Sequence, residues 1–505
     1  MKKLAWLGTG TMVVLVAIVV IVPAWVDLSI FKSTYLPLIE DTLHRRVDVG
    51  DVRFSLVPTP SIQLSNLRVS DGPAFPDNTF FAAQRLRLRL KLWPLLRGRF
   101  EVTEFAVEKP VINLLKRPDG TFNYFELADK AAPLAKRNER KKTPTTAKPQ
   151  EPVVLPLGLP TRVRINNGQL NLETKGQKPL RINGIDLFLQ EFSSTRPFPY
   201  RASFSYPGLK SVSLEGELSY REDQASLVVK DNRLKIQDIV LPVEGTVSHL
   251  TTAPRVNLSL ASDQLDAKPV FEILSVFGLA PRDTDLSGPL GLRIMISGPS
   301  NSLATEIRGL FNDVKVNNKR ALKGHLNGEV LIKLPAGGGS VSRRLQGDGK
   351  LTARDGELTN IDLIKKIQRV TGMIGLSKDE QRQATTFKTL EADFIIANGF
   401  ADFKRIYLIN PQMEVNGGGT MTLAQPTLNM TLETALSSRA SSRADRVKTA
   451  SFFKDSRGRI VVPLKITGPV ENPAVNLDSQ MVLGKGMNEK MEKGLGSLFK
   501  QLFHR

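Results

Sequence analysis

Cysteine is absent from this chain of 505 residues, and histidine occurs only four times, at positions 44, 249, 325 and 504. Without cysteine there is no disulfide framework, no thiolate metal site and no cysteine nucleophile. The four histidines are too far apart in the sequence for a local metal-ligand spacing such as i, i+4. Gly-x-Ser-x-Gly and Walker A patterns are also missing, and the carboxylates are scattered singly. We therefore expect no enzyme, no metal site and no cofactor.

Acidic residues are outnumbered, since 70 Lys and Arg face 50 Asp and Glu and the net charge is +20. A balance this basic favours anionic partners such as nucleic acid, lipid headgroups or acidic components of a cell envelope. The chain is nevertheless 41% hydrophobic and 24% charged, so it is expected to fold. Its length predicts roughly two to four domains.

One long apolar run is present, from Leu4 through Leu15 to Val26. As a helix, its roughly 23 residues reach about 34 Å, which is enough for a hydrocarbon core of about 30 Å. The two lysines before it predict a single-pass anchor with a cytoplasmic N-terminus and an exported body. The alternative is a cleaved signal peptide, since Val22-Pro23-Ala24 loosely matches a cleavage site. Both interpretations remove the body from the cytoplasm, so nucleic acid is not an expected partner.

Period-two alternation dominates the exported part and is clearest in RLRLRLKL, residues 85–92. A strand separates the two kinds of residue, whereas a helix would scatter the charges around its axis. One face of this strand would line an apolar groove with Leu86, Leu88, Leu90 and Leu92. The other face would either hold anionic headgroups or be the solvated face of an outer strand, and it carries Arg85, Arg87, Arg89 and Lys91.

Turn dipeptides are frequent: Asn-Gly begins at 167, 183, 327, 398 and 416, and Asp-Gly at 71, 119, 348 and 355. Both tolerate the positive φ of tight hairpins, so consecutive strands are expected to be antiparallel neighbours. The glycine clusters at 347–349 and 417–419 are predicted to be turns or bulges between strands. Helices are expected only at 33–44, 268–279, 361–376 and in the tail. A long loop is expected at 437–448.

A short pattern, Pro-x-aliphatic-Asn-apolar, recurs at 254–258, 426–430 and 473–477. Gly-Pro also recurs, at 298–299 and 468–469. Proline suits the start of a strand because it need not donate to the ladder there. Either convergent turn chemistry or a true repeat unit explains the recurrence.

Composition divides the chain into six segments. They are a cytoplasmic tip and transmembrane anchor (1–26), an N-terminal β module (27–128), a basic linker (129–152), a central β module (153–340), a C-terminal β module (341–480) and a basic tail helix (481–505). The linker has no β-branched apolar residue and is expected to be disordered. The apolar stripe of the tail either lies in an anionic membrane interface or packs on the protein's own sheet, and it comprises Met487, Met491, Leu495, Leu498, Phe499, Leu502 and Phe503.

So many strands present a large apolar face that the few expected helices cannot cover. The sheets must therefore pack on each other as sandwiches or barrels, or form a trough whose lining holds something apolar.

Three parts of the chain resemble the AsmA family of bacterial envelope proteins. The first follows the anchor and contains FSLVPTPSIQLSNLRVSDGPAF (54–75) and KLWPLLRGRFEVTEFAVEKPVINLLKRPDGTFNYFEL (91–127). The second is GDGKLTARDGELTNIDL (347–363), and the third is IVVPLKITGPVENPAVNLD (460–478). Residues 153–340 show only general β character.

The resemblance implies a mostly β fold, in which an N-terminal transmembrane helix is followed by an elongated antiparallel β-sheet groove with few short helices. This design is related to chorein-type and TamB-like proteins. The resemblance also implies an inner-membrane protein with its body in the periplasm that carries phospholipid between inner and outer membranes. A scaffold that modulates the assembly or targeting of outer-membrane proteins, without lipid transport, is the open alternative. The family offers no catalytic residues to carry over.

Overall fold

The computed structural model describes residues 36, 40 and 45–481, except 57, 72–77, 98, 100, 117–121, 124–159, 175–178, 210, 224, 251–252, 277–283, 320–321, 338, 360, 372–383, 445–452 and 479. The predicted anchor (4–26), the basic linker (129–152) and the apolar stripe of the tail (487–503) lie outside these residues. In the part of the chain that is described, no helix is both long and apolar enough to cross a membrane.

Most described residues lie in strands and only a few lie in short helices, so the predicted mostly β fold is confirmed. The chain divides into two compact units. Unit 1 contains residues 1–258 and 299–301, and unit 2 contains residues 259–298 and 302–505. The predicted boundary at 340/341 falls between two strands of unit 2 that pair with each other.

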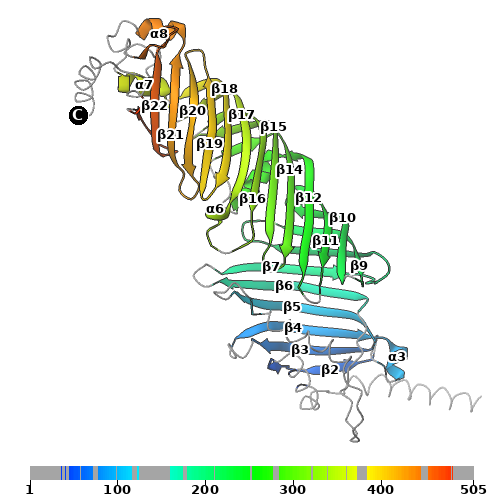
Figure 1. The fold of residues 1–505 in the computed structure, drawn as a ribbon. Coiled ribbons are helices and arrows are strands. Elements are labelled where there is room, and N and C mark those ends of the chain that lie inside the picture. The colour runs from blue at the N-terminus through cyan, green and yellow to red at the C-terminus, as the bar shows by residue number, and fades with distance from the viewer. Residues whose placement is uncertain are drawn as a thin grey trace, which may run out of the picture. The chain divides into compact units, whose positions relative to one another are not determined.

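The sheet of unit 1 follows the order of the chain (Figure 1). Its strands are β1 (Val47–Asp48), β2 (Val52–Ser55), β3 (Ser61–Ser70), β4 (Thr79–Leu90), β5 (Val102–Lys116), β6 (Arg162–Thr174), β7 (Leu180–Leu189), β8 (Phe198–Ser205), β9 (Val212–Arg221), β10 (Ser226–Ile236) and β11 (Ile239–Ser248). From β3 onward each strand pairs with the next, and β1 and β2 both pair with β3. The helix α3 (Leu92–Leu96) lies between β4 and β5.

One pair in unit 1 departs from the expected antiparallel order, because β5 and β6 are parallel. More than forty residues separate the two strands in the sequence. A parallel pair needs a crossover of about a dozen residues or more, and the segment that contains the basic linker is long enough to provide it.

The sheet of unit 2 also follows the chain. Its elements are most of β12 (Arg255–Asp266), α5 (Ala267–Val276), β13 (Thr284–Ser287), β14 (Pro289–Pro299), β15 (Ala304–Asn318), β16 (Leu322–Leu334), α6 (Val341–Arg344), β17 (Gln346–Leu358), α7 (Leu363–Thr371), β18 (Thr385–Ala397), β19 (Phe400–Ile409), β20 (Met413–Thr422), β21 (Thr427–Leu436), α8 (Ser438–Ala444), β22 (Val461–Pro469) and β23 (Ala474–Leu477). Strands β14 to β23 pair in sequence, all antiparallel. No pairing among the described strands closes either sheet, so both are open.

The helix α7 falls inside the predicted range 361–376 and α5 begins one residue before the predicted range 268–279, but the long loop predicted at 437–448 is wrong. Residues 438–444 form α8. Its serines favour turns and helix caps in isolation, but Ala440 and Ala444 are buried in the core of unit 2. Burial of this small apolar face outweighs the weak helix propensity of the segment.

A row of left-handed residues crosses unit 1 from β3 to β7. Asn66, Lys109 and Asn167 have φ of 51°, 46° and 51°, and Gly184 has φ of 60°. The strand registers place these positions along one line across the sheet. At Asn167 and Gly184 the register with the neighbouring strand shifts by one residue, as in a β-bulge, whereas it stays regular across Asn66 and Lys109.

A left-handed residue also shifts the side-chain alternation of its strand by one residue. In β3, Ile62 and Leu64 precede Asn66 whereas Leu67 and Val69 follow it, yet all four apolar side chains pack in the same cluster. The apolar side of the sheet therefore stays on one face although strict period-two alternation is broken.

Most of the predicted hairpin turns are wrong. Among the pairs that the structure fully describes, only Asn398-Gly399 is a tight turn, joining β18 to β19 with φ of 54° and 85°. The pairs at 167, 183, 327, 348, 355 and 416 lie inside strands, as do the glycine clusters 347–349 and 417–419. These dipeptides report a positive φ or a close approach of two backbones, which a bulge requires as much as a hairpin does.

The recurring Pro-x-aliphatic-Asn pattern marks the same local geometry twice. Pro254 and Pro426 stand one residue before β12 and β21. Their carbonyl oxygens accept hydrogen bonds from the backbone N–H of Ser300 and Val470, each the residue directly after a Gly-Pro dipeptide, with N–O distances of 2.8 and 3.1 Å. In each case a strand leads into a helix (α5 or α8) and a later strand ends in Gly-Pro, with the short β13 intervening in the first case, which favours a true repeat over convergence.

Candidate functional site

Each sheet has a polar face on which charged side chains pair across neighbouring strands. Bonds of this kind join Arg201 to Glu215 at 3.1 Å in unit 1, and Lys323 to Glu357 at 2.7 Å in unit 2. Pairs this exposed add little stability but keep their strands soluble. The polar face is therefore the water-facing side of each sheet.

The predicted cationic face of β4 belongs to this polar side. Arg85 pairs with Glu108 and Arg89 with Glu104, both at 2.7 Å, and the carboxylates come from β5. Lys91 pairs with Glu101 at 2.9 Å. Arg87 donates to the amide oxygen of Gln63 at 3.3 Å. These contacts favour the solvated-strand interpretation, and binding of anionic headgroups here stays a prediction.

Three of the four predicted lining leucines share the apolar face of β4 and Leu92 does not, while their role as the lining of a lipid groove stays a prediction. Leu86 and Leu88 are half-buried on the apolar face, and Leu90 is buried. The strand ends at Leu90, and Leu92 begins α3 with 46% of its surface exposed. The alternation continues in the sequence beyond the strand, but Pro94 has no backbone N–H to donate to a ladder and its neighbours turn into a helix.

In unit 1, the apolar face is left without a described covering element across β6 and β7. None of its apolar side chains in these two strands is fully buried and none is fully exposed. We call this set the unit-1 strip: Val163, Ile165, Leu170, Leu172, Leu180, Ile182, Ile185, Leu187 and Leu189. The two strands pair so that Ile165 faces Leu187 and Leu170 faces Ile182. The strip is a continuous apolar surface that is open on one side.

A second strip lies across β14, β15 and β16 in unit 2. Ile294, Ile307 and Ile332 are direct cross-strand neighbours and all three are half-buried. We call their face the unit-2 strip: Leu292, Ile294, Ile296, Ile307, Val330, Ile332 and Leu334. Its residues share the partial exposure of the unit-1 strip.

The same apolar face is fully covered at the C-terminal end of unit 2, where α7 and α8 lie (Figure 1). Ile367 of α7, Ala444 of α8 and Leu464 of β22 have no exposed surface. Within unit 2, helices therefore cover one part of the apolar face and leave another part uncovered. Among the described residues, no helix covers either of the two strips.

Tyr200 of β8 places a phenol on the apolar face of unit 1, where it is paired with Leu189 of the unit-1 strip. Burial raises the pKa of Tyr200 to about 12, because the charged phenolate would be poorly solvated there. The surroundings of the strip are therefore apolar enough to disfavour charge.

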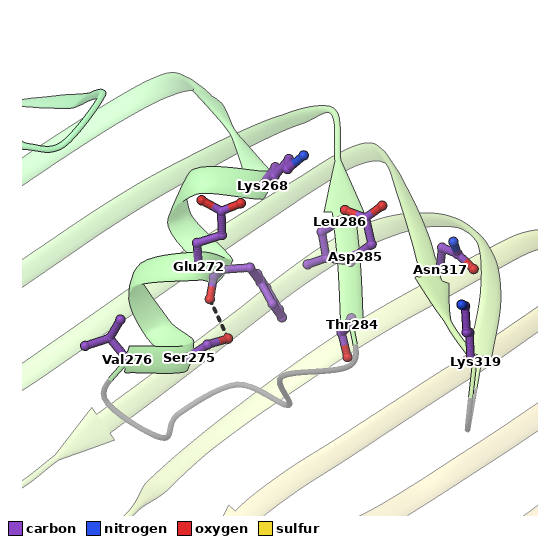
Figure 2. Close-up of a pocket in the computed structure, with 10 residues that line it drawn as sticks. Lys268, Glu272, Ser275, Val276, Thr284, Asp285, Leu286, Asn317 and Lys319 are labelled. Carbon is purple, nitrogen blue, oxygen red and sulfur yellow. Dashed lines mark hydrogen bonds between the residues drawn. The ribbon is translucent and has the colours of Figure 1, made fainter. Parts of the chain in front are cut away.

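A cavity of about 680 Å³ lies between α5 and β13 in unit 2 (Figure 2). Phe271 and Leu286 give it an apolar part, but its other lining residues include two lysines and two carboxylates. These are Lys268, Lys319, Glu272 and Asp285. The cavity has the size of a small-molecule site. Its balanced charge selects no class of ligand, so the two strips are the stronger candidate site.

Sequence reasoning missed a buried polar cluster in unit 1. Arg45 donates to Asp71 at 3.0 Å and to the carbonyl oxygen of Asn123 at 2.8 Å, while the Asn123 amide donates to Asp71 at 2.9 Å. The side chains of Arg45 and Asp71 are 2% exposed, and the guanidinium lies 4.4 Å from the ring centre of Phe80. No periodicity marks these residues. The available signal was the place of Asp71 and Asn123 in the two N-terminal segments that resemble AsmA.

No group of three or more histidine, aspartate or glutamate side chains in the described part of the chain is arranged to hold a metal ion. The family model described as the AsmA family matches residues 1–268, which is more than half of the chain. This chain belongs to the AsmA family. The resemblance predicted from the sequence is confirmed for this part. The resemblance of residues 347–363 and 460–478 lies beyond the matched range and stays a prediction. The comparisons with curated proteins and with solved structures found no match for this AsmA-family chain.

Proposed function

We propose that this AsmA-family protein is a non-enzymatic envelope protein that holds phospholipid by its acyl chains along the two apolar strips. Its N-terminal helix anchors it in the inner membrane and its body lies in the periplasm, where it helps to move phospholipid towards the outer membrane. Family membership and the open β-sheets fit an envelope protein. The observation that carries the lipid proposal is the partial exposure of the whole apolar face of β6 and β7.

The dimensions of the strips suit acyl chains. A hydrocarbon core about 30 Å thick contains two leaflets, so one acyl chain spans about 15 Å. A strand of ten residues is about 33 Å long, whereas two neighbouring strands span about 5 Å and three about 10 Å. A chain can therefore lie along either strip. Leaving such a surface in water would cost about 25 cal/mol for each Å² of apolar area, which favours an apolar occupant.

The alternative function is a scaffold for outer-membrane protein assembly that binds no lipid. The fully buried cluster under α7 and α8 favours it locally, since that part of the apolar face has no room for a ligand. The two proposals differ in whether the strips are occupied.

Lipid counting on the full chain tests the proposal. The protein is purified in detergent, and its bound phospholipid is extracted and measured by mass spectrometry. In Ile182→Glu/Leu187→Glu the apolar face of β7 gains two charges, so bound lipid should fall clearly below the wild-type amount. Arg181→Glu is the matched control, because it changes charge on the exposed opposite face of the same strand. An unchanged lipid count in the double variant contradicts the proposal, since lipid around the anchor is common to all three proteins.

A further inference from the structure

The short helix α3 exposes the most accessible large apolar side chains among the described residues. Trp93 is 73% exposed, Leu96 68% and Leu92 46%. All three lie within five residues of each other. Apolar side chains exposed singly are ordinary, but a tryptophan and two leucines on one helical turn form a patch.

The helix packs only loosely on its own unit. None of its residues is fully buried, and only Pro94 and Leu95 are half-buried. Backbone hydrogen bonds hold its two ends. The backbone N–H of Leu95 donates to the carbonyl oxygen of Lys91, and the backbone N–H groups of Arg97 and Arg99 both donate to the carbonyl oxygen of Pro94. The chain re-enters the sheet where the backbone N–H of Lys91 donates to the carbonyl oxygen of Glu101 at 2.9 Å. The patch is therefore a fixed projection at the end of the β4–β5 hairpin (Figure 1).

The charges beside the patch are positive and uncompensated. Arg97 and Arg99 are exposed, and neither guanidinium pairs with a carboxylate of any described residue. This differs from Arg85, Arg89 and Lys91 of the same hairpin, each of which has a glutamate partner. Tryptophan prefers the membrane–water interface, and arginine beside it attracts anionic headgroups.

We propose that α3 docks unit 1 onto the surface of an anionic lipid bilayer, with Trp93 and Leu96 inserted at the headgroup level and Arg97 and Arg99 on lipid phosphates. This goes beyond the proposed function, because the contact does not require that lipid moves along the sheet. It adds a route for such movement, since β5 pairs with β6 and so places the hairpin beside the unit-1 strip.

Fluorescence of Trp93 in the full chain tests the docking. The chain has three tryptophans, at 6, 25 and 93, so Trp6→Phe/Trp25→Phe leaves Trp93 as the only reporter. This protein is reconstituted into vesicles of phosphatidylcholine and phosphatidylglycerol, with and without brominated acyl chains. Brominated lipid should quench Trp93 emission by about half or more, and the vesicles should shield Trp93 from acrylamide. Arg97→Glu/Arg99→Glu should weaken the quenching in anionic vesicles.

The matched control moves the reporter within unit 1. Val240 of β11 is 45% exposed and lies seven strands from β4, about 34 Å away. Val240→Trp, in a chain with Phe at 6, 25 and 93, should not be quenched. Equal quenching at 93 and 240, or a Trp93 that is unquenched and open to acrylamide, overturns the proposal.

The outcome is separable from that of the lipid-strip proposal. If Ile182→Glu/Leu187→Glu keeps its lipid, the proposed function fails while quenching of Trp93 stays as expected. If Trp93 is not quenched, the docking fails while the lipid count stays as expected. All substituted residues at α3 are exposed, and thermal melting by circular dichroism checks that each variant remains folded.

Discussion

Asp71 lies between the guanidinium of Arg45 and the amide of Asn123, and it accepts a hydrogen bond from each inside unit 1. This single carboxylate joins the segment before β1, the end of β3 and the segment after β5. A buried ion pair contributes little over a well-packed apolar substitute, but loss of one partner leaves the other charge without compensation.

Asp71→Ala should therefore lower the free energy of unfolding of unit 1 by about 3–5 kcal/mol. Asp51→Ala is the control, because Asp51 and Arg53 form a pair in the same unit at 3.9 Å with 62% and 72% of their side chains exposed. Its effect should be too small to detect by urea unfolding. Similar losses for the two variants would refute a special role for the buried cluster.

Tyr200 predicts a change of stability at alkaline pH. Burial raises the pKa of Tyr200 to about 12 in the folded protein, above the value near 10 that tyrosine has when unfolded. A raised folded-state pKa gives a stability contribution that is complete below pH 10 and is lost as pH rises through about 12. From pH 9 to pH 12 the unfolding free energy of the wild type should therefore fall relative to that of Tyr200→Phe, which has no phenol to ionise. A difference that does not vary with pH would show that Tyr200 is well solvated.

Two glycines in neighbouring strands of unit 2 should respond differently to alanine. At Gly328, with φ of 128°, a Cβ would overlap the carbonyl oxygen of Lys350 across the β16–β17 ladder. At Gly309 a Cβ would meet only the Phe311 ring, at 3.6 Å. Gly328→Ala should cost about 2 kcal/mol or more, and Gly309→Ala should stay within about 0.5 kcal/mol. Equal costs in chemical unfolding would show that the backbones are not in close approach.

At the scale of elements, the sequence predicts strands well where alternation is strict and poorly where a bulge interrupts it. Alternation predicts the strand from Arg85 to Leu90 correctly because no positive φ falls inside it. Asn167-Gly168 wrongly predicts a hairpin because the dipeptide indicates a positive φ but not whether the chain then reverses. The phase shift from Leu64 to Leu67 across Asn66 is visible in the sequence and distinguishes the two cases.

The candidate site was predictable only in part, for a related reason. Alternation identifies which residues share a face, and it placed Leu86, Leu88 and Leu90 together correctly. It cannot show which stretch of that face a helix will cover. Whether a helix covers the apolar face depends on tertiary packing, as when α8 packs against strands distant in the sequence. The helix propensity of the serine-rich sequence of α8 does not predict a helix there.

Covered and uncovered stretches of the face should differ in stability cost. Ile367 in α7 is 0% exposed within the core cluster, so Ile367→Ala should lower the unfolding free energy of unit 2 by about 2–5 kcal/mol. Ile332→Ala removes the same atoms from the half-buried unit-2 strip and should cost less than about half as much. Guanidinium unfolding of the two variants provides the comparison. Equal losses would mean that the strip is packed as tightly as the core.

For the whole molecule, the arrangement follows from a mismatch between apolar face and covering helices. Each unit is an open sheet with a charged, paired face and an apolar face, and described helices roof only the C-terminal end of unit 2. Family membership indicates the envelope, and the sheets supply the surface on which an apolar ligand could lie. The central claim is that lipid occupies this surface and avoids the opposite one.

Photo-crosslinking of the full chain in cells tests this claim most directly. A photoreactive amino acid is placed at adjacent positions on opposite faces: Leu172 against Glu173 in unit 1, and Ile332 against Lys333 in unit 2. Each pair shares one strand and one depth, so only the face differs. Phospholipid should be captured at Leu172 and Ile332 and not at Glu173 and Lys333. Equal capture from both faces, or none from either, would contradict the account.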